Sequence, residues 1–471
     1  MVVSAVVLSF GAILAGPSAQ VPAQPVLSPA IPTIEQVVAA FEAADKACND
    51  GKGHSESPDS GTLGWGESTW LRTYWELYEL TGQTRWWDKI IEHFERMIAH
   101  MTDHDGDGFK SWQTRTYSTA LIRAEPLHNR GTATLSVKQA KIFNNEQARE
   151  VTGHRYLVEF IDEKTYTVRD ATAGKVLVPR EPYKSGKSIA VAPHVVITLA
   201  GGPVQGDMFS VSTTAPGPVE YVVHQGMVLT PVARFIEAVL KRSPEDRYHV
   251  KAREFLAVIE RHFLEGNEKY WIDTGDGAGA YRFTPDPTER YPNRILPHNQ
   301  YLAPARTWLI LADATGKALY RQRATAMAKN FKRALRLTEG AYEWYYWDWI
   351  ENGKPDHSGM EDTSHGHIDV GFVVEAARRG VVFDAEDARR LANTLLGRMW
   401  NGSMTDPRFG SHVNTSKGNS LPVVDWIDLC QWDPKVFDVI ATAVMTRCDR
   451  TEQATLLPTV LAVKQRTCAR K

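Results

Sequence analysis

A histidine, an asparagine and a tyrosine open one of the apolar helical segments of the sequence. His298, Asn299 and Tyr301 directly follow Pro297, and proline disfavours helix just before it, so a helix is predicted to begin here with free backbone N–H groups. The positive end of a helix dipole can hold an anionic group, and imidazole and carboxamide groups can add donors. The spacing indicates a site that binds an anion and moves a proton, with plain helix capping as the alternative.

A second polar cluster occupies residues 359–369, "GMEDTSHGHID". Three residue types that favour the N-cap of a helix stand just before His365 and His367. On a helix these two side chains point in different directions, whereas an extended start would place them and Asp369 on one face, as a metal site requires. We predict a catalytic or carboxylate-binding role for His365 and His367, with no bound metal.

An aromatic run follows at residues 340–349, "GAYEWYYWDW". It holds six aromatic side chains in ten residues, which is too many for one strand to bury. Trp344 is a candidate for stacking on a ligand, and Tyr345 or Tyr346 could move a proton once nearby cations lower the pKa of the phenol.

An acidic turn lies in "TDHDGDGFKSW". Asp103, Asp105 and Asp107 match the first half of an EF-hand loop, but Thr114 stands where the bidentate glutamate belongs. Calcium is possible at this turn, and a tight acidic turn without an ion is the alternative. No other cofactor is predicted.

Paired helices recur along the chain and position these groups. Residues 64–82 and 85–101 have helical periodicity on either side of a glycine, so they predict an antiparallel hairpin. The further predicted pairs are residues 224–240 with 247–264, 298–316 with 320–335, and 364–380 with 384–400, and a weaker copy starts near Asp425. Such hairpins cannot bury their apolar faces alone and must pack on one another.

Residues 131–217 interrupt this repeat. They are rich in Val, Thr and Tyr with alternation and glycine punctuation, which is typical of strands, so we predict an inserted β module. The predicted organisation is a signal peptide at 1–25, a first helical part at 30–130, the β module at 131–217 and a second helical part at 218–471.

The row of hairpins is predicted to curl into a ring. The hairpins begin with polar or aromatic residues, which favours convergence on one centre, and long aromatic segments after each pair suit the rim of a cleft. The predicted fold class is mainly α, an incomplete (α/α) toroid of about five to seven helical hairpins with a small inserted β module. Ligand-binding positions on this cleft are predicted at Trp65, Glu67, Trp112, His224 and Trp344.

Composition bounds the partners and the compartment. The net charge of -2 gives no global attraction to nucleic acid, and none is expected as a partner. The apolar start followed by small residues fits a secretory signal, although no Lys or Arg precedes Lys46, and no later run suits a membrane span. We expect a secreted monomer in which four cysteines permit two disulfides.

These features resemble the alginate-lyase-like polysaccharide lyases over roughly residues 34–130 and 218–465. The resemblance rests on the helical hairpins, on the pair His298 and Asn299 that opens an inner helix, and on the tyrosine-rich rim. It implies that an Asn and a His hold a uronate carboxylate, that an Arg assists and that a Tyr moves the proton. The pair occurs here in the reverse order, as His-Asn.

The remaining roles are open among several residues. The resemblance leaves the proton-moving tyrosine among Tyr301, Tyr345 and Tyr346. No arginine stands at the family's spacing before the rim tyrosines, so Arg282 or Arg294 would substitute as a substrate-binding group.

The resemblance implies a secreted lyase that cleaves a uronate polymer, such as alginate or glucuronan, by β-elimination. Each donor placed on the uronate carboxylate would lower the activation free energy of the elimination by roughly 3 to 4 kcal/mol. One alternative is a glycoside hydrolase on a similar toroid, with two carboxylates. The candidates for those carboxylates are Glu67, Asp273, Asp276, Glu361 and Asp362. The other alternative is a non-catalytic carbohydrate-binding surface protein.

Overall fold

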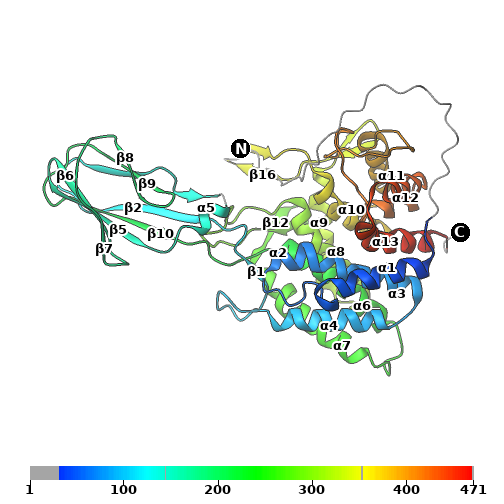
Figure 1. Cartoon of the computed structure of the whole chain (residues 1–471). Coiled ribbons are helices and arrows are strands. Elements are labelled where there is room, and N and C mark those ends of the chain that lie inside the picture. The colour runs from blue at the N-terminus through cyan, green and yellow to red at the C-terminus, as the bar shows by residue number, and fades with distance from the viewer. Residues whose placement is uncertain (1–30, 144, 352–353, 469–471) are drawn as a thin grey trace.

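The computed structural model describes residues 31–143, 145–351 and 354–468. It is mainly helical, with several small sheets, and Figure 1 shows a helical body from which a β module projects to the left. The predicted signal peptide at 1–25 lies outside the described residues. Within the described part, every helix is too short or too polar to cross a membrane.

Helical hairpins build the body. In each predicted pair the first helix packs at the centre and the second lies outside it. The pairs are α3 (Ser68–Thr81) with α4 (Arg85–Ala99), α6 (Val222–Leu240) with α7 (His249–Val258), α8 (His298–Thr315) with α9 (Ala318–Ala334), and α10 (Thr363–Arg378) with α11 (Ala385–Asn393). The weaker copy is a short 3-10 helix, η6 (Trp426–Gln431), followed by α12 (Lys435–Arg447), and α13 (Arg450–Cys468) and α1 (Ile34–Ala47) complete the body.

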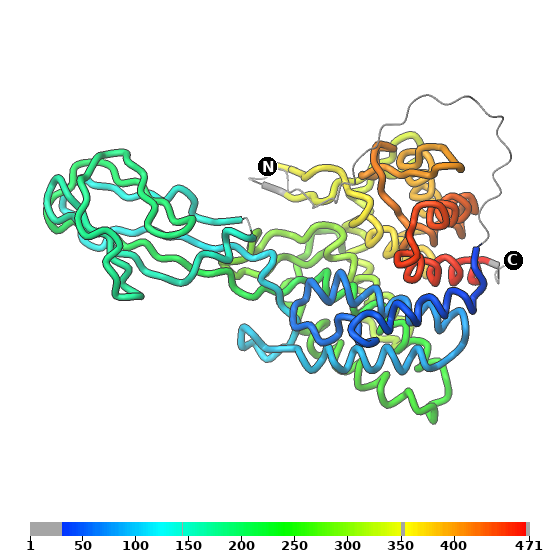
Figure 2. The backbone as a smooth tube through the Cα atoms, viewed as in Figure 1, coloured from blue at the N-terminus to red at the C-terminus, as the bar shows by residue number. Residues whose placement is uncertain are grey.

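The central helices contact one another in sequence order. α3 packs on α6, α6 on α8, α8 on α10 and α10 on η6, and α13 contacts both η6 and α3. Figure 2 shows the last helix of the body, in red, beside the first, in blue. The series of contacts that begins at α3 therefore ends at α3 again and is closed.

Burial separates the central helices from the outer ones. In α8 nearly every residue from His298 to Ala312 is buried, whereas in α9 only a stripe faces the core, formed by Tyr320, Ala324, Met327, Ala328 and Phe331. A helix that is apolar on all sides must be enclosed by other elements, and an amphipathic one lies at the surface. The amino-acid pattern therefore specifies which member of each hairpin faces the centre.

The β module has a hydrophobic core of its own. A six-stranded antiparallel sheet has the order β4-β2-β10-β5-β6-β7, and a three-stranded sheet has the order β3-β9-β8. The strands are β2 (Ala120–His128), β3 (Thr134–Val137), β4 (Lys141–Ile142), β5 (Arg155–Asp162), β6 (Thr165–Asp170), β7 (Lys175–Pro182), β8 (Ser188–Ala192), β9 (Val195–Ala200) and β10 (Met208–Thr214). The short helix α5 (Asn145–Arg149) precedes β5. The first strand thus begins before the predicted boundary at residue 131.

Short strand pairs connect the module and edge the helical body. β1 (Gln113–Thr114) pairs with β11 (Val219–Glu220), so the chain enters and leaves the module at neighbouring points. The other pairs are β12 (Trp271–Gly275) with β13 (Ala278–Tyr281), β14 (Arg336–Thr338) with β15 (Ala341–Glu343), and β16 (Asp348–Glu351) with β17 (Lys354–His357). The last two hold the predicted aromatic run between α9 and α10.

The cysteines whose side chains the structure describes form no disulfide. Cys48, Cys430 and Cys448 are free thiols. Burial raises the pKa of the Cys430 thiol to about 11, which keeps it protonated at neutral pH.

Candidate functional site

His298 opens α8 between a phenol and a carboxylate. Its Nδ1 lies 2.7 Å from the Tyr301 hydroxyl and its Nε2 lies 3.0 Å from Asp348 Oδ2. Asn330 Nδ2 donates to the same hydroxyl over 3.1 Å, so the hydroxyl hydrogen is directed to Nδ1. His298 therefore carries its ring hydrogen on Nε2 and donates it to Asp348.

Two buried oxygens beside His298 lack a donor. Asn299 Oδ1 and Gln300 Oε1 accept no hydrogen bond from the described residues. The Gln300 amide nitrogen donates to the Tyr346 hydroxyl over 3.5 Å, and His298 N donates to the Tyr346 carbonyl over 3.3 Å. The rim at Tyr346 thus fixes the first turn of α8 and leaves two acceptors unused, which buried polar groups rarely are.

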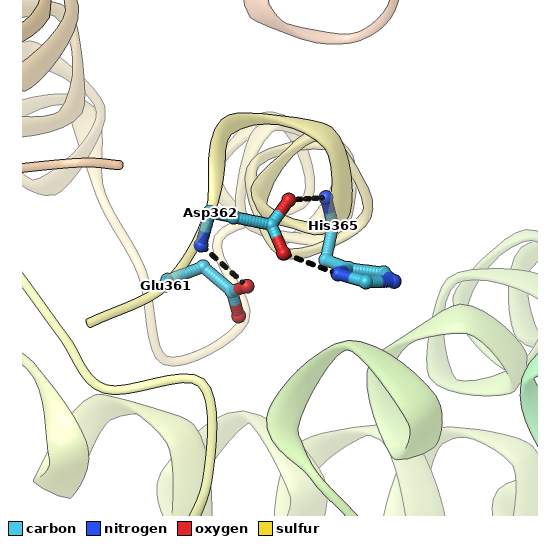
Figure 3. Close-up of side chains that lie close together, drawn as sticks. All are labelled: Glu361, Asp362 and His365. Atoms are coloured by element: carbon cyan, nitrogen blue, oxygen red, sulfur yellow. Dashed lines mark hydrogen bonds and ion pairs between the residues drawn. The ribbon is translucent and has the colours of Figure 1, made fainter. Parts of the chain in front are cut away.

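The start of α10 is capped by a carboxylate that also binds an imidazole. Asp362 Oδ1 accepts from the backbone N–H groups of Ser364 and His365, and Oδ2 lies 2.5 Å from His365 Nδ1 (Figure 3). Burial opposes ionisation of Asp362, but the bond to His365 outweighs it and holds the pKa of the carboxyl well below its usual range. Burial alone would lower the pKa of His365, but the same bond raises it. The two groups form an ion pair at neutral pH.

Glu361 and Asp369 form a carboxyl pair beside this ion pair. Both side chains are fully buried, and Glu361 Oε2 and Asp369 Oδ1 receive no hydrogen from any N–H or hydroxyl of the described residues. The two carboxyl groups lie close enough for each to act on the pKa of the other, and two carboxyl groups in contact share one proton. Burial and the charges of Asp369 and Asp362 raise the pKa of Glu361 far above its usual range, and burial raises that of Asp369 to about 6. Glu361 therefore holds the shared proton.

Aromatic side chains surround His365 at the start of α10. The His365 ring lies 5.3 Å from the Tyr346 ring and 6.0 Å from the Trp65 ring, and Trp65 lies 5.4 Å from His224, measured between centroids. Trp65 is 39% exposed, and the side chains of His365 and Asp362 are 36% and 34% exposed. Solvent thus reaches these three residues, while Glu361 lies behind them. We call the group formed by Asp348, Glu361, Asp362, Asp369, His365, Tyr346 and Trp65 the acidic cleft.

Several of the predicted site residues come together here. Tyr346, His365 and Trp65 belong to the acidic cleft, and His298, Asn299 and His224 adjoin it. Tyr301 is fully buried behind His298, where it orients the imidazole but cannot touch a bound molecule. Burial lowers the pKa of His224 to about 3, and its Nε2 has no partner among the described residues.

Other predicted residues lie elsewhere. Tyr345 stacks on His357 with 3.6 Å between ring centroids, and Arg336 covers the same ring, so this phenol faces away from His365. His367 points to Asp425, with Nδ1 3.1 Å from Oδ2. Because α10 is helical from Thr363 onward, His365 and His367 diverge, and the alternative metal site that used both is not formed.

Three predicted ligand-binding residues are core residues instead. Glu67 is fully buried, accepts from His54 N and contacts His93 Nδ1, both at 2.5 Å, and so anchors the loop before α3 rather than the cleft wall. Trp112 is 1% exposed and donates to the Met97 carbonyl over 2.7 Å. Trp344 is fully buried and donates to Asp369 Oδ2 over 2.8 Å. Their placement corrects the expectation that they line the cleft directly.

The two predicted arginines stand at the rim. Arg282 forms a β-bridge with Ile295, and its Nε is buried without an acceptor among the described residues. The Arg294 guanidinium lies 5.6 Å from the Trp349 ring centroid. Neither is among the contacts of the acidic cleft described above.

The acidic turn at residues 103–107 is neutralised by a lysine. The Lys269 ammonium bonds to Asp105 Oδ2 over 3.0 Å and also to Asp107 Oδ2. Asp103 Oδ2 accepts from Gly108 N over 3.0 Å, which closes the turn. The Lys269 ammonium therefore neutralises two of the three carboxylates at which the spacing suggested calcium.

A separate cavity runs between the central helices below the cleft. Arginine and acidic side chains line it, and they pair with one another: Arg306 Nη1 donates to Asp425 over 2.7 Å and Arg378 Nη2 to Asp428 over 2.6 Å. His367 lies on its wall. The cavity carries both charges in pairs, whereas the acidic cleft also holds Glu361 and Asp369, whose carboxyl groups form no ion pair among the described residues.

Comparison with known proteins shows no family. No protein-family model and no curated protein sequence matches the chain. Solved structures with a detected likeness include FlgL of Xanthomonas campestris in two crystal forms, at 15% and 12% identity, and the flagellar junction protein FlgL of Legionella pneumophila at 13%. The matches cover 50%, 64% and 42% of this chain and 88%, 97% and 75% of the others, with TM-scores of 0.16, 0.16 and 0.15. Likenesses at this level carry no argument about the fold or function of this chain.

The predicted identity and function are corrected by these findings. No family model and no curated sequence supports the predicted polysaccharide-lyase family, and none of the solved structures named above is a lyase. The predicted family, the lyase activity and the uronate partner are therefore corrected and not retained. The two carbohydrate-directed alternatives are corrected with them. The charge of the site gives a physical reason, because Asp348, Asp362 and Asp369 would repel the carboxylate of a uronic acid rather than neutralise it.

Two contributors to the site escaped the sequence analysis. Asp348 lies inside the aromatic run and Gln300 lies inside the first turn of α8, and neither stands out by type or spacing. Glu361 and Asp369 were noticed only separately, as a hydrolase candidate and as a possible metal ligand. Glu361 and Asp369 are eight residues apart, on either side of the point where the extended chain becomes helix at Asp362. This spacing could have predicted that their carboxyl groups meet.

Proposed function

We propose that the protein binds a positively charged ligand in the acidic cleft. One observation carries this proposal: Glu361 and Asp369 are fully buried carboxyl groups whose facing oxygens have no donor among the described residues. A buried charge without a partner costs several kcal/mol, so such a pair holds either a proton or a cation.

The surroundings favour a cation over an anion. The groups that act on Asp369 and could be positive are His298 and His365, and each already faces its own carboxylate, Asp348 and Asp362. The unused Asn299 and Gln300 oxygens add acceptors beside them. The aromatic rings of Trp65 and Tyr346 would also attract a cation, by about 0.5 to 2 kcal/mol for each well-placed ring.

Two wider features belong to the same proposal. The ring of contacts from α3 through α6, α8, α10 and η6 to α13 supports the predicted toroid, with the acidic cleft at the first turns of its central helices. The apolar character of residues 1–25 supports export of the chain from the cell.

Calorimetric titration of the full chain tests this function. We expect at least one of two cationic probes, Co²⁺ or 1,4-diaminobutane, to bind with one site per chain, and Glu361→Gln to weaken that binding at least tenfold. Glu339→Gln makes the same change on a side chain that is 81% exposed, and serves as the matched control. If neither probe binds, or if both variants bind alike, the acidic cleft is not a cation site.

A further inference from the structure

We propose that the positively charged ligand is a divalent transition-metal ion held by Glu361, Asp362 and His365. This inference rests on the proposed function of the acidic cleft and specifies its ligand. It differs from the metal site considered from sequence, because His367 takes no part and Glu361 replaces Asp369 as a direct ligand.

The three side chains are already close enough to share an ion. One carboxylate oxygen from each acid and one ring nitrogen of His365 all lie within 4.8 Å of one another. In Figure 3 the Asp362 carboxyl lies between Glu361 and His365, at the first turn of α10. Ligand atoms around an ion at about 2.1 Å are roughly 3.4 Å apart, so small side-chain rotations complete the site.

The backbone holds this arrangement firmly. Asp362 caps α10 through two backbone N–H groups, and Asp362 N also donates to Glu361 Oε1 over 3.0 Å. Val413 N donates to the Glu361 carbonyl over 3.0 Å, which ties the residue to a second segment. These bonds hold Glu361 and Asp362 without using Glu361 Oε2, which can bind an ion once Glu361 has lost the proton shared with Asp369.

The ligand types select the class of metal. Two carboxylates and an imidazole suit Zn²⁺, Mn²⁺, Co²⁺ or Ni²⁺, whereas Ca²⁺ and Mg²⁺ prefer oxygen alone. When the ion binds, His365 offers Nδ1 and keeps its hydrogen on Nε2, which points away from Asp362 in Figure 3. Binding of the ion releases two protons to solvent: the Nδ1 proton of His365 and the proton that Glu361 shares with Asp369. Asp369 then serves as an outer acceptor for the site.

The site is open on one side. His365 and Asp362 are about one third exposed, and Trp65 and Tyr346 flank the opening. Three protein ligands leave at least one coordination position free for water or a small molecule from solvent.

Cobalt provides a direct probe. The full chain, stripped with EDTA and dialysed, is titrated with Co²⁺ while visible absorption and bound metal are measured, and Zn²⁺ is then added in competition. We expect one Co²⁺ per chain, a visible spectrum typical of a bound nitrogen ligand, and displacement by Zn²⁺. Glu361→Gln and His365→Gln should each weaken Co²⁺ binding at least tenfold.

Control variants separate this site from others. Asp105→Asn alters the second acidic cluster and His357→Gln alters an exposed histidine, and both should bind Co²⁺ as the parent chain does. His365→Gln changes a partly exposed side chain, so it stays informative if Glu361→Gln does not fold. Unchanged Co²⁺ binding in His365→Gln, or loss of binding in Asp105→Asn, would overturn the metal site.

The same titrations distinguish the proposed metal ion from the more general proposal that the acidic cleft binds a cation. If 1,4-diaminobutane binds in a Glu361-dependent manner and Co²⁺ does not, the metal inference is wrong and the cation-binding function stands. If neither binds, both are wrong.

Discussion

Arg306 Nη1 donates to Asp425 Oδ1 over 2.7 Å and thereby ties the middle of α8 to the residue that precedes η6. Asp425 also contacts His367 and has a φ of 61°, a backbone conformation that few non-glycine residues adopt. The pair is mostly buried, with 15% and 9% of the two side chains exposed.

Removing one partner of this pair should destabilise the fold. Arg306→Met leaves the buried Asp425 carboxylate without its guanidinium, so the free energy of unfolding should fall by about 3 to 5 kcal/mol. Urea unfolding followed by circular dichroism measures the change. The double variant Arg306→Met/Asp425→Asn should lose less, and an equal loss in both variants would show that the charge pairing is not the cause.

Stability should depend on pH through Glu289. Burial raises the pKa of this carboxyl from 4.5 to about 7 in the folded chain. Below about pH 4.5 Glu289 is protonated in both the folded and the unfolded state, so its burial does not lower the free energy of unfolding. As the pH rises to 7, the unfolded state releases this proton and the folded state keeps it, so the free energy of unfolding falls. Above pH 7 the decrease is complete, at roughly 3 kcal/mol.

Glu289→Gln removes this titration. The variant should therefore gain stability relative to the parent chain as the pH is raised from 4.5 to 8, by up to about 3 kcal/mol at the upper end. Chemical unfolding across that range provides the measurement. A stability difference that does not change with pH would contradict the assigned cause; Glu76, whose pKa burial also raises to about 7, supplies an independent second case.

Trp65 should matter for binding more than for folding. Its side chain is 39% exposed beside His365, so Trp65→Ala should shift the melting temperature by only a few degrees. Loss of its ring face should weaken 1,4-diaminobutane binding roughly two- to fivefold, because an exposed cation–π contact contributes about 0.5 to 1 kcal/mol. Trp65→Phe should retain most of the affinity. Equal affinities in the alanine variant and the parent would remove Trp65 from the cleft's binding surface.

Lys269 should control calcium binding at the acidic turn. Because its ammonium already neutralises Asp105 and Asp107, added calcium should leave the melting temperature of the parent chain unchanged. Lys269→Met exposes the carboxylates, so 1 to 10 mM calcium chloride, roughly the range of weak extracellular sites, should stabilise this variant more than the parent. Asp105→Asn added to Lys269→Met should abolish the gain, and a calcium response in the parent chain equal to that of the variant would refute the role of the lysine.

The hairpins could be predicted because their patterns are strongly periodic. α8 has a long apolar stretch and closes at Gly316 with a φ of 71°, and α3 closes in the same way at Gly82 with a φ of 66°, so both ends are visible in the sequence. The fifth hairpin was predicted less well, because the helix that follows Asp425 is a short 3-10 helix rather than an α-helix. There, ion pairs with Arg306 and His367 outweigh local preference.

The site was harder to predict than the fold. Sequence spacing placed His298 and His365 at helix starts, but it could not show that His298 faces a carboxylate, since Asp348 comes from β16 fifty residues later. The contact of His365 with Asp362 is local and was open to prediction, but Asp362 was considered only as an N-cap and as a hydrolase carboxylate. Glu67 and Trp112 were misplaced for a related reason: a polar or amphipathic side chain near a helix start satisfies a buried donor or acceptor as readily as it meets a ligand.

The contact between α13 and α3 has a consequence for biosynthesis. Thr459 donates to Glu76 across this contact over 2.8 Å, and Arg466 pairs with Glu79. Since α3 is made early and α13 near the end of the sequence, one flank of α3 stays uncovered on the ribosome while several hundred residues are added. A chain halted before α13 should expose that flank to chaperones, and its fate in the cell would depend on them.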